Sequence, residues 1–286
     1  MSRPESRFDQ YSESQLLSGS VSIMSNEIVA AAPGRIVPRI RQKSNDMVGP
    51  AGHESDDLSR RVSPREFPEL MDGDISYEDF RECVHCLQKV NRWLLGYRPT
   101  LTWLERLPRG LREPMHIVDL GSGGGDLLRQ IAGWARRRGI AVQLTGIDLN
   151  PYAARVAAES TPKELGITWV TGDARAYRPE KPMDIVVSSL LAHHLEDEEI
   201  VALLRRMEAT VRLGWFINDL ERAEWTCRMF GLVRWHPIVR HDGLVSFRRA
   251  FRKEDWVRLL AAADVPREVV TVERWRPGRL CVGRWK

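Results

Sequence analysis

The chain has 286 residues, of which 43% are hydrophobic and 29% are charged, a balance typical of a soluble globular protein. It contains no run of ~18 apolar residues and no apolar segment near its start, so we expect neither a membrane-spanning helix nor a secretory signal. Basic residues outnumber acidic ones by 43 to 39, and nearly all of them are arginine, so this small excess does not by itself predict a nucleic-acid partner.

The four cysteines are too few for a disulfide scaffold of this length, and we expect a reducing, cytoplasmic location. Cys83 and Cys86 form a CxxC pair, but no second pair follows to complete a zinc site. Because the pair falls within a helical pattern of apolar residues, we interpret both cysteines as small residues on a helix. The sequence therefore predicts no metal site.

Residues 1–62 form the first region, which is rich in polar residues, Pro and Gly and lacks hydrophobic periodicity. We predict that this region is a disordered tail. Residues 63–114 predict a helical N-terminal cap. One helix is expected over 77–95, where apolar residues recur every three or four positions, and a second over 99–107.

Strand and helix patterns alternate over residues 115–286, which is typical of βαβ units around a parallel sheet. Strands are predicted over 116–120, 142–148, 167–171, 183–189, 214–218, 269–275 and 279–285, and helices over 126–138, 152–159, 196–212 and 253–262. The last two strands flank Pro277 and Gly278 and are expected to form an antiparallel hairpin. The predicted fold is therefore α/β, a Rossmann-like doubly wound sheet of seven strands preceded by the helical cap.

A glycine-rich turn joins the first predicted strand to its helix, in the segment VDLGSGGGD. Gly121, Gly123 and Gly125 lie at relative positions 1, 3 and 5, whereas a dinucleotide fingerprint has its third glycine at position 6. Such a turn lets a ligand approach the backbone, and the helix N-terminus offers free amide groups. Asp119 can receive an ammonium group, which favours an amino-acid-like ligand over a pyrophosphate.

Acidic residues also end the next two predicted strands. Asp148 closes the second strand, where a carboxylate can accept hydrogen bonds from ribose hydroxyls. Asp173 follows the third strand, in position for an adenine amino group. A single acid at a strand end is ordinary, but three in order on consecutive strands are hard to attribute to chance.

As a set, the segments VDLGSGGGD, GIDLNP, TGDA and DIVVSSLLAHHL resemble the motifs of class I S-adenosylmethionine-dependent methyltransferases, over about residues 115–286. The resemblance implies S-adenosyl-L-methionine as cofactor, with Asp119 on the methionine amino group, Asp148 on the ribose and Asp173 on adenine. The expected cofactor-binding residues are Asp119, Gly121, Ser122, Gly123, Gly125, Asp148, Leu149, Asp173, Ala174 and Ser189.

A closer resemblance involves the segments PELMD, VNRWLLGYRPTLTWL, MEATVRLGWFINDL and RHDGLVSFRRAF. They look like a bacterial subfamily of small-molecule methyltransferases related to the ubiquinone and menaquinone enzymes and associated with polyketide and phenolic-lipid pathways. This resemblance implies a small hydrophobic acceptor (a phenol, quinol or polyketide), with methylation of oxygen favoured over carbon.

Two other functions stay open at this point. An RNA or protein methyltransferase has less support, because SSLL follows the fourth strand where an Asn-Pro-Pro-Tyr-type segment would stand. A catalytically inactive S-adenosylmethionine-binding partner protein is compatible with intact ligand motifs. We expect no nucleic-acid partner and no stable membrane insertion, although peripheral contact is compatible with the sequence, which leaves the oligomeric state open.

The candidate general bases are His193, His194, Asp219 and His241. The first three follow the fourth and fifth predicted strands, at the edge where ligands bind in open α/β sheets. Each has a structural alternative: the paired histidines can pack or cap the next helix, and Asp219 can satisfy backbone groups. The HDG segment that contains His241 also reads as a turn.

An apolar stretch over residues 225–235 lies between the fifth strand and that segment. Core packing is the favoured interpretation, with a hydrophobic lid over the acceptor site as the alternative.

Overall fold

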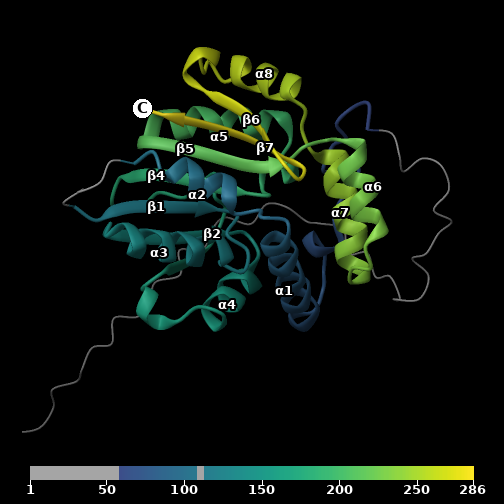
Figure 1. Ribbon diagram of the computed structural model, residues 1–286, viewed down its shortest axis with the longest axis horizontal. Helices are drawn as coiled ribbons and strands as arrows, with labels where there is room; N and C mark the ends of the chain where they lie inside the picture. The colour runs from purple at the N-terminus through teal and green to yellow at the C-terminus, as the bar shows by residue number, and fades with distance from the viewer. Residues whose placement is uncertain (1–57, 108–112) are drawn as a thin grey trace, which may run out of the picture. The chain divides into compact units, whose positions relative to one another are not determined.

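The computed structural model describes residues 58–107 and 113–286 (Figure 1). The predicted tail up to residue 57 lies outside the described residues. The end of that tail differs from the prediction, because Leu58 and Val62 are only 4% and 3% exposed. The folded part therefore begins before the predicted boundary at residue 62.

A seven-stranded sheet with the order β3-β2-β1-β4-β5-β7-β6 forms the centre of the fold. Its strands are β1 (Met115–Leu120), β2 (Val142–Asp148), β3 (Thr168–Thr171), β4 (Met183–Ser189), β5 (Val211–Leu220), β6 (Thr271–Trp275) and β7 (Arg279–Trp285). Strands β1 to β5 are parallel, and β7 pairs antiparallel with both β5 and β6. The doubly wound sheet with an antiparallel C-terminal hairpin is thus confirmed.

Helices cover both faces of this sheet (Figure 1). Helices α5 and α8 pack on one hydrophobic face, and α2 and α3 pack on the other. The α-helices are α1 (Tyr77–Trp93), α2 (Arg98–Leu104), α3 (Asp126–Arg138), α4 (Pro151–Glu159), α5 (Asp197–Thr210), α6 (Glu224–Leu232), α7 (Pro237–Arg249) and α8 (Lys253–Ala262). Short 3-10 helices are η1 (Leu70–Asp72), η2 (Lys163–Leu165), η3 (Ala192–His194) and η4 (Arg267–Val269). Strand β1 is buried throughout, as expected for a parallel strand covered on both faces.

The boundary between α5 and β5 differs from the prediction of a helix over 196–212. The helix ends at Thr210, and Val211 already pairs with Met183 of β4. Val211 is also only 3% exposed. Sheet pairing and burial here outweigh the local helical pattern, since helix propensity is a weak preference.

The segment 241–243 lies inside α7 and is not a turn. Pro237 stands in the first turn of this helix, where its fixed φ angle is favourable. Gly243 has a packing role, because a Cβ atom there would lie 2.3 Å from the ring of Phe230 on α6. Helices α1, α6 and α7 gather beyond the carboxyl ends of the parallel strands (Figure 1).

Residues 58–72, which we call the strap, are bound to the same edge of the sheet. Arg61 donates hydrogen bonds to the carbonyl oxygens of Leu195 (2.6 Å) and Arg249 (2.8 Å). Its guanidinium also pairs with Asp197 at 2.6 Å. These contacts explain why the folded part begins before residue 62.

The other end of the strap is held by α7. The Asp242 carboxylate accepts hydrogen bonds from the backbone amides of Leu70 (2.8 Å) and Met71 (3.0 Å). Because Asp242 is 4% exposed, these bonds are shielded from water. They fix η1 against α7 and so position the residue that precedes it, Glu69.

Candidate functional site

The turn between β1 and α3 combines a packed glycine with an open one. Gly121, Gly123 and Gly125 have φ angles of 72°, 48° and 73°, a conformation that favours glycine. A Cβ atom on Gly125 would lie 2.3 Å from the ring of Trp169, so no side chain fits there. A Cβ atom on Gly123 would meet no atom of the described residues within 4 Å. The turn therefore forms a cradle that a ligand can approach at Gly123.

Asp119 of β1 is a buried carboxyl group beside this cradle. It is 1% exposed, and within the described ranges its Oδ1 atom has no hydrogen-bond partner. Burial raises the pKa of Asp119 well above its usual range, and the charges of Asp126 and Asp148 add to this effect. A buried carboxylate is unfavourable unless a cation or donor reaches it, so Asp119 fits the ammonium group of a ligand.

Asp148 ends β2 and faces the same turn. Its carboxylate accepts hydrogen bonds from the backbone amides of Gly123 (2.8 Å) and Asn150 (2.9 Å). Burial raises the pKa of Asp148, and these two bonds act in the opposite direction. A carboxylate has about four acceptor positions, so Asp148 can hold the turn and still accept bonds from ligand hydroxyls.

Asp173 follows β3 and is engaged by a residue that the sequence analysis did not single out. Nη2 of Arg175 lies 2.7 Å from Oδ2 of Asp173, and the same guanidinium binds Glu199 of α5. Hydrogen bonding from Arg175 lowers the pKa of Asp173. A contact between Asp173 and adenine stays a prediction, and it requires the carboxylate to be shared with Arg175.

The other expected cofactor residues lie along the same edge with different exposures. Ser122 is buried in the turn, where its carbonyl oxygen accepts a hydrogen bond from Gly125. Leu149 is 71% exposed, whereas Ala174 packs against the core. Ser189 is half-buried at the end of β4. Their contacts with a cofactor stay predictions.

His193 of η3 and Asp219 of β5 form a buried pair. Nδ1 of His193 lies 2.7 Å from Oδ1 of Asp219. Burial alone would lower the pKa of His193, but the carboxylates of Asp219 and Glu69 raise it to about 9. The parallel pairing of β4 and β5 brings these two predicted catalytic residues together, since His193 follows β4 and Asp219 lies near the carboxyl end of β5.

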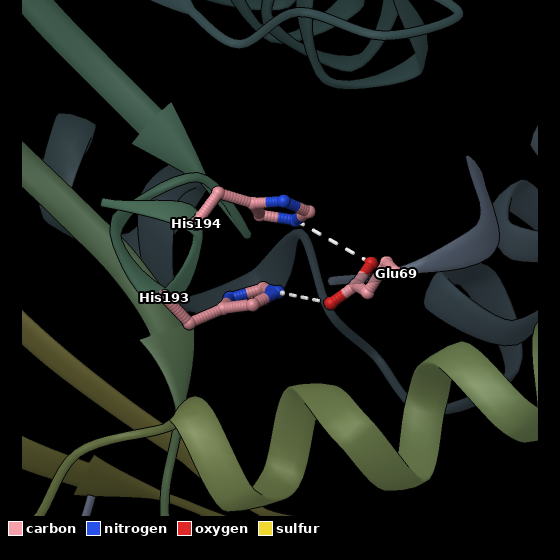
Figure 2. Close-up of side chains that lie close together, drawn as sticks. All are labelled: Glu69, His193 and His194. Carbon is pink, nitrogen blue, oxygen red and sulfur yellow. Dashed lines mark ion pairs between the residues drawn. The ribbon is translucent and has the colours of Figure 1, made fainter. Parts of the chain in front are cut away.

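The carboxylate of Glu69, on the strap, faces the side chains of both His193 and His194 (Figure 2). Its Oε1 atom is 3.6 Å from Nε2 of His193, and its Oε2 atom is 3.6 Å from Nε2 of His194. On its other side, His194 has Nδ1 at 3.0 Å from Oδ2 of Asp72. Each imidazole is therefore held between two carboxylates.

Glu69 was not among the predicted site residues, and its position depends on α7. Ser246 and Arg249 each donate a hydrogen bond to Oε1 of Glu69 at 2.7 Å, from 177 and 180 residues further along the chain. Burial raises the pKa of Glu69, but His194, His193 and Arg249 together lower it below its usual range. The PELMD segment contains this residue, yet nothing local in it indicates that the acid is buried.

His241, the fourth predicted catalytic residue, has a different partner. Its Nδ1 atom lies 3.0 Å from Oδ1 of Asp242 on the same helix, and its side chain is 51% exposed. The hydrogen bond with Asp242 raises the pKa of His241. The structure thus joins three of the four predicted catalytic residues through direct contacts with Glu69 or Asp219, and His241 stands beside them on α7.

The apolar stretch 225–235 does not form core along its whole length. On α6, Trp225, Met229 and Leu232 are 50%, 57% and 77% exposed, so the core prediction is wrong for these residues. Helix α6 packs through its other face, where Phe230 contacts Phe247 of α7 with ring centroids 5.7 Å apart. A lid role for the stretch stays a prediction.

Comparison with known proteins agrees with this geometry. A family model described as a methyltransferase domain matches residues 117–214, from β1 to the first half of β5. Over these residues the chain is similar to methyltransferase domains. The matched residues include the glycine-rich turn and both histidines of η3, whereas Glu69 and the strap lie outside the match.

Curated relatives of the methyltransferase domain are named trans-aconitate 2-methyltransferase. One, from Streptomyces avermitilis, is 36% identical over 95 residues, which are 32% of this chain and 34% of the relative. Another, from Mycobacterium tuberculosis, is 36% identical over 84 residues, or 29% of each chain. The matched residues thus cover about a third of the length of each of these relatives.

Solved structures share the fold of the domain. Human N-acetylserotonin methyltransferase, solved in complex with S-adenosylmethionine, aligns with 74% of this chain and 56% of its own, with a TM-score of 0.51 and 18% identity. At this identity the likeness concerns the fold alone.

Among the helices of residues 58–107 and 113–286, none is long and apolar enough to cross a bilayer.

Proposed function

We propose that this chain transfers a methyl group from S-adenosylmethionine to an oxygen atom of a small hydrophobic acceptor such as a phenol, quinol or polyketide. The observation that carries the proposal is the buried Asp119 carboxyl, whose Oδ1 atom has no hydrogen-bond partner among the described residues, beside the open position at Gly123. A buried carboxyl without a partner is unfavourable in a ligand-free protein, so its presence at the carboxyl edge indicates a ligand with a positive group.

The part of the site formed by the β1–α3 turn, Asp119 and Asp148 is called the cofactor end. Asp119 would take the ammonium group of the cofactor, and Asp148 would accept hydrogen bonds from its ribose. When bound there, S-adenosylmethionine supplies a methyl group already activated by the positive charge on sulfur. The residues of the chain therefore need mainly to orient the acceptor and exclude water.

The cluster of Glu69, His193, His194 and Asp219 is called the acceptor end. His194 is near enough to the cofactor end for its charge to lower the pKa of Asp148. An oxygen acceptor gains from groups that stabilise it as its proton leaves, and imidazoles beside carboxylates are groups of this kind. This chemistry supports methylation of oxygen over carbon.

The cover over the acceptor end supports a small acceptor. Glu69 and His193 are 7% and 2% exposed, because the strap and α7 lie against η3. A folded protein or an RNA helix would have to displace these elements to reach the cluster. A small molecule requires a much smaller opening.

Isothermal calorimetry with S-adenosylmethionine tests the cofactor end. We expect binding by the wild type and at least a tenfold loss in Asp148→Ala, since bonds to a charged acceptor contribute about 1.5–3 kcal/mol each. Glu180→Ala is the matched control, because Glu180 is an exposed acid outside the site. No binding by the wild type, or equal binding by both variants, would contradict the proposal.

Incubation with methyl-labelled S-adenosylmethionine tests the acceptor class. A panel of phenols, quinols and polyketides should give a labelled product whose methyl group is released by ether-cleaving reagents. Label on tRNA or protein and on none of the panel would exclude the small-molecule proposal. Binding of the cofactor without any labelled product would favour the inactive partner protein.

A further inference from the structure

We infer that Glu69, His193 and His194 form a binding site for one divalent transition-metal ion, with Zn²⁺ as the best fit, at the acceptor end. Figure 2 shows the two imidazoles directed at the carboxylate from the same side. One donor atom from each of the three side chains lies within 4.8 Å of the other two. The sequence alone predicts no metal site, since these three ligands come from distant segments.

The orientation of both histidines is the first argument. A carboxylate can only accept, so Nδ1 of His193, 2.7 Å from Asp219, and Nδ1 of His194, 3.0 Å from Asp72, each carry the hydrogen of their bond. The Nε2 atoms of both rings are then the ones directed at Glu69. A histidine that ligates a metal typically donates its other N–H to a carboxylate in this manner.

The spacing of the donor atoms is the second argument. Nε2 of His194 lies 3.6 Å from Oε2 of Glu69 and Nε2 of His193 lies 3.6 Å from Oε1, which is too long for a good hydrogen bond, and the three donor atoms all lie within 4.8 Å of one another. Ligands ~2.0–2.2 Å from a zinc ion at tetrahedral angles lie roughly 3.3–3.6 Å from one another. Ser246 and Arg249 occupy Oε1 of Glu69, so Oε2 is the oxygen left to bind the ion.

The local charge is the third argument. The groups in direct contact are the carboxylates of Glu69, Asp72 and Asp219 and the guanidinium of Arg249, which give a net charge of −2 when both histidines are neutral. A divalent cation neutralises this charge. Two protons on the imidazoles are the competing way to do so, and the experiment below separates the two.

The role of the ion rests on the proposed function. Two histidines and one carboxylate leave a coordination position for a further ligand, as in catalytic zinc sites. An acceptor hydroxyl bound there would lose its proton to water more readily, because the metal would stabilise the oxygen anion that then receives the methyl group. The metal site thus specifies the acceptor class as a molecule with a metal-binding hydroxyl or enol oxygen.

The test is zinc titration of the full chain after treatment with EDTA, followed by calorimetry and elemental analysis. We expect one Zn²⁺ per chain in the wild type and at least a 100-fold weaker affinity in His194→Asn, whose side chain is 25% exposed and tolerant of change. Asp72→Asn changes the partner of Nδ1 of His194 and removes the ion pair of Asp72 with Arg249, and it should weaken binding by about 10–100-fold. Cobalt should give the visible absorption of a four-coordinate site in the wild type and not in His194→Asn.

The matched control is His85→Asn, because His85 lies between Cys83 and Cys86 on α1 and outside the cluster. Equal zinc affinity in His194→Asn and His85→Asn would overturn the site, as would a wild type that binds no stoichiometric zinc. Circular dichroism and cofactor binding by His194→Asn confirm that the variant is folded. A chain that binds zinc but not S-adenosylmethionine contradicts only the proposed function, and the reverse result contradicts only the metal site.

Discussion

The cofactor end and the acceptor end lie on the same edge of the sheet but are built in different ways. The cofactor end comes from one short stretch of chain: Asp119 lies in β1, the turn follows β1, and Asp148 ends the neighbouring strand β2. At the acceptor end, Asp72 reaches His194 across 122 residues, and Glu69 is fixed by a helix near the C-terminus. The first end depends on local backbone geometry, and the second on the docking of the strap and α7.

The largest expected effect is the loss of stability on substitution of Gly125, in the turn of the cofactor end. Gly125→Ala combines a positive φ angle with a Cβ contact of 2.3 Å to Trp169, so it should lower the free energy of unfolding by about 2–5 kcal/mol. Gly123→Ala is the control, with open space around its Cβ atom and only the φ penalty of about 1–2 kcal/mol. Urea denaturation measures both, and equal losses would contradict the packing argument.

The next effect is the release of the strap from α7, which should disturb the acceptor end and leave the cofactor end intact. Asp242→Ala removes both hydrogen bonds to the backbone of η1 and should lower the free energy of unfolding by about 2–4 kcal/mol. The strap should become sensitive to limited proteolysis, while affinity for S-adenosylmethionine changes less than threefold. Glu254 is an exposed acid on α8, so Glu254→Ala should neither lower the free energy of unfolding nor expose the strap to proteolysis. A parallel loss of cofactor affinity would show that the two ends are not independent.

A smaller effect separates stability from binding at the cofactor end. Asp119→Asn removes a buried charge, so the ligand-free protein should gain about 1–3 kcal/mol at neutral pH and bind S-adenosylmethionine at least tenfold more weakly. The pKa of Asp119 is raised by burial, so its contribution to stability is present below its unfolded pKa of ~3.9 and is lost as pH rises. The gain should therefore grow from pH 4 upward in denaturation series of both proteins. A gain independent of pH would contradict this assignment.

The smallest effect concerns α6. Leu232→Gln should change the free energy of unfolding by less than about 0.5 kcal/mol, because Leu232 is 77% exposed. Leu204→Ala on α5, at a fully buried position, should cost about 2–5 kcal/mol by the same measurement. A large loss in Leu232→Gln would restore the core interpretation of this stretch.

The same contrast explains which parts of the fold and of the site can be predicted from the sequence. The strands, the hairpin and the three acids follow from periodicity and motifs that span a few residues, and α3 has the predicted bounds. Glu69 could not be predicted, because a buried acid needs partners that only the tertiary structure supplies. The turn alternative for the HDG segment rests on glycine being typical of turns and is wrong, because Gly243 lies inside α7, where it packs against Phe230.

The anchoring of Arg61 to the carbonyl of Arg249 has a consequence for the order of folding. This bond joins residues 188 apart, and the entropy lost on closing a loop increases with its length. The strap can make this bond only after β5, α6 and α7 have been synthesised. During translation the residues of the cofactor end are therefore complete before the elements that hold the strap over the acceptor end have been synthesised.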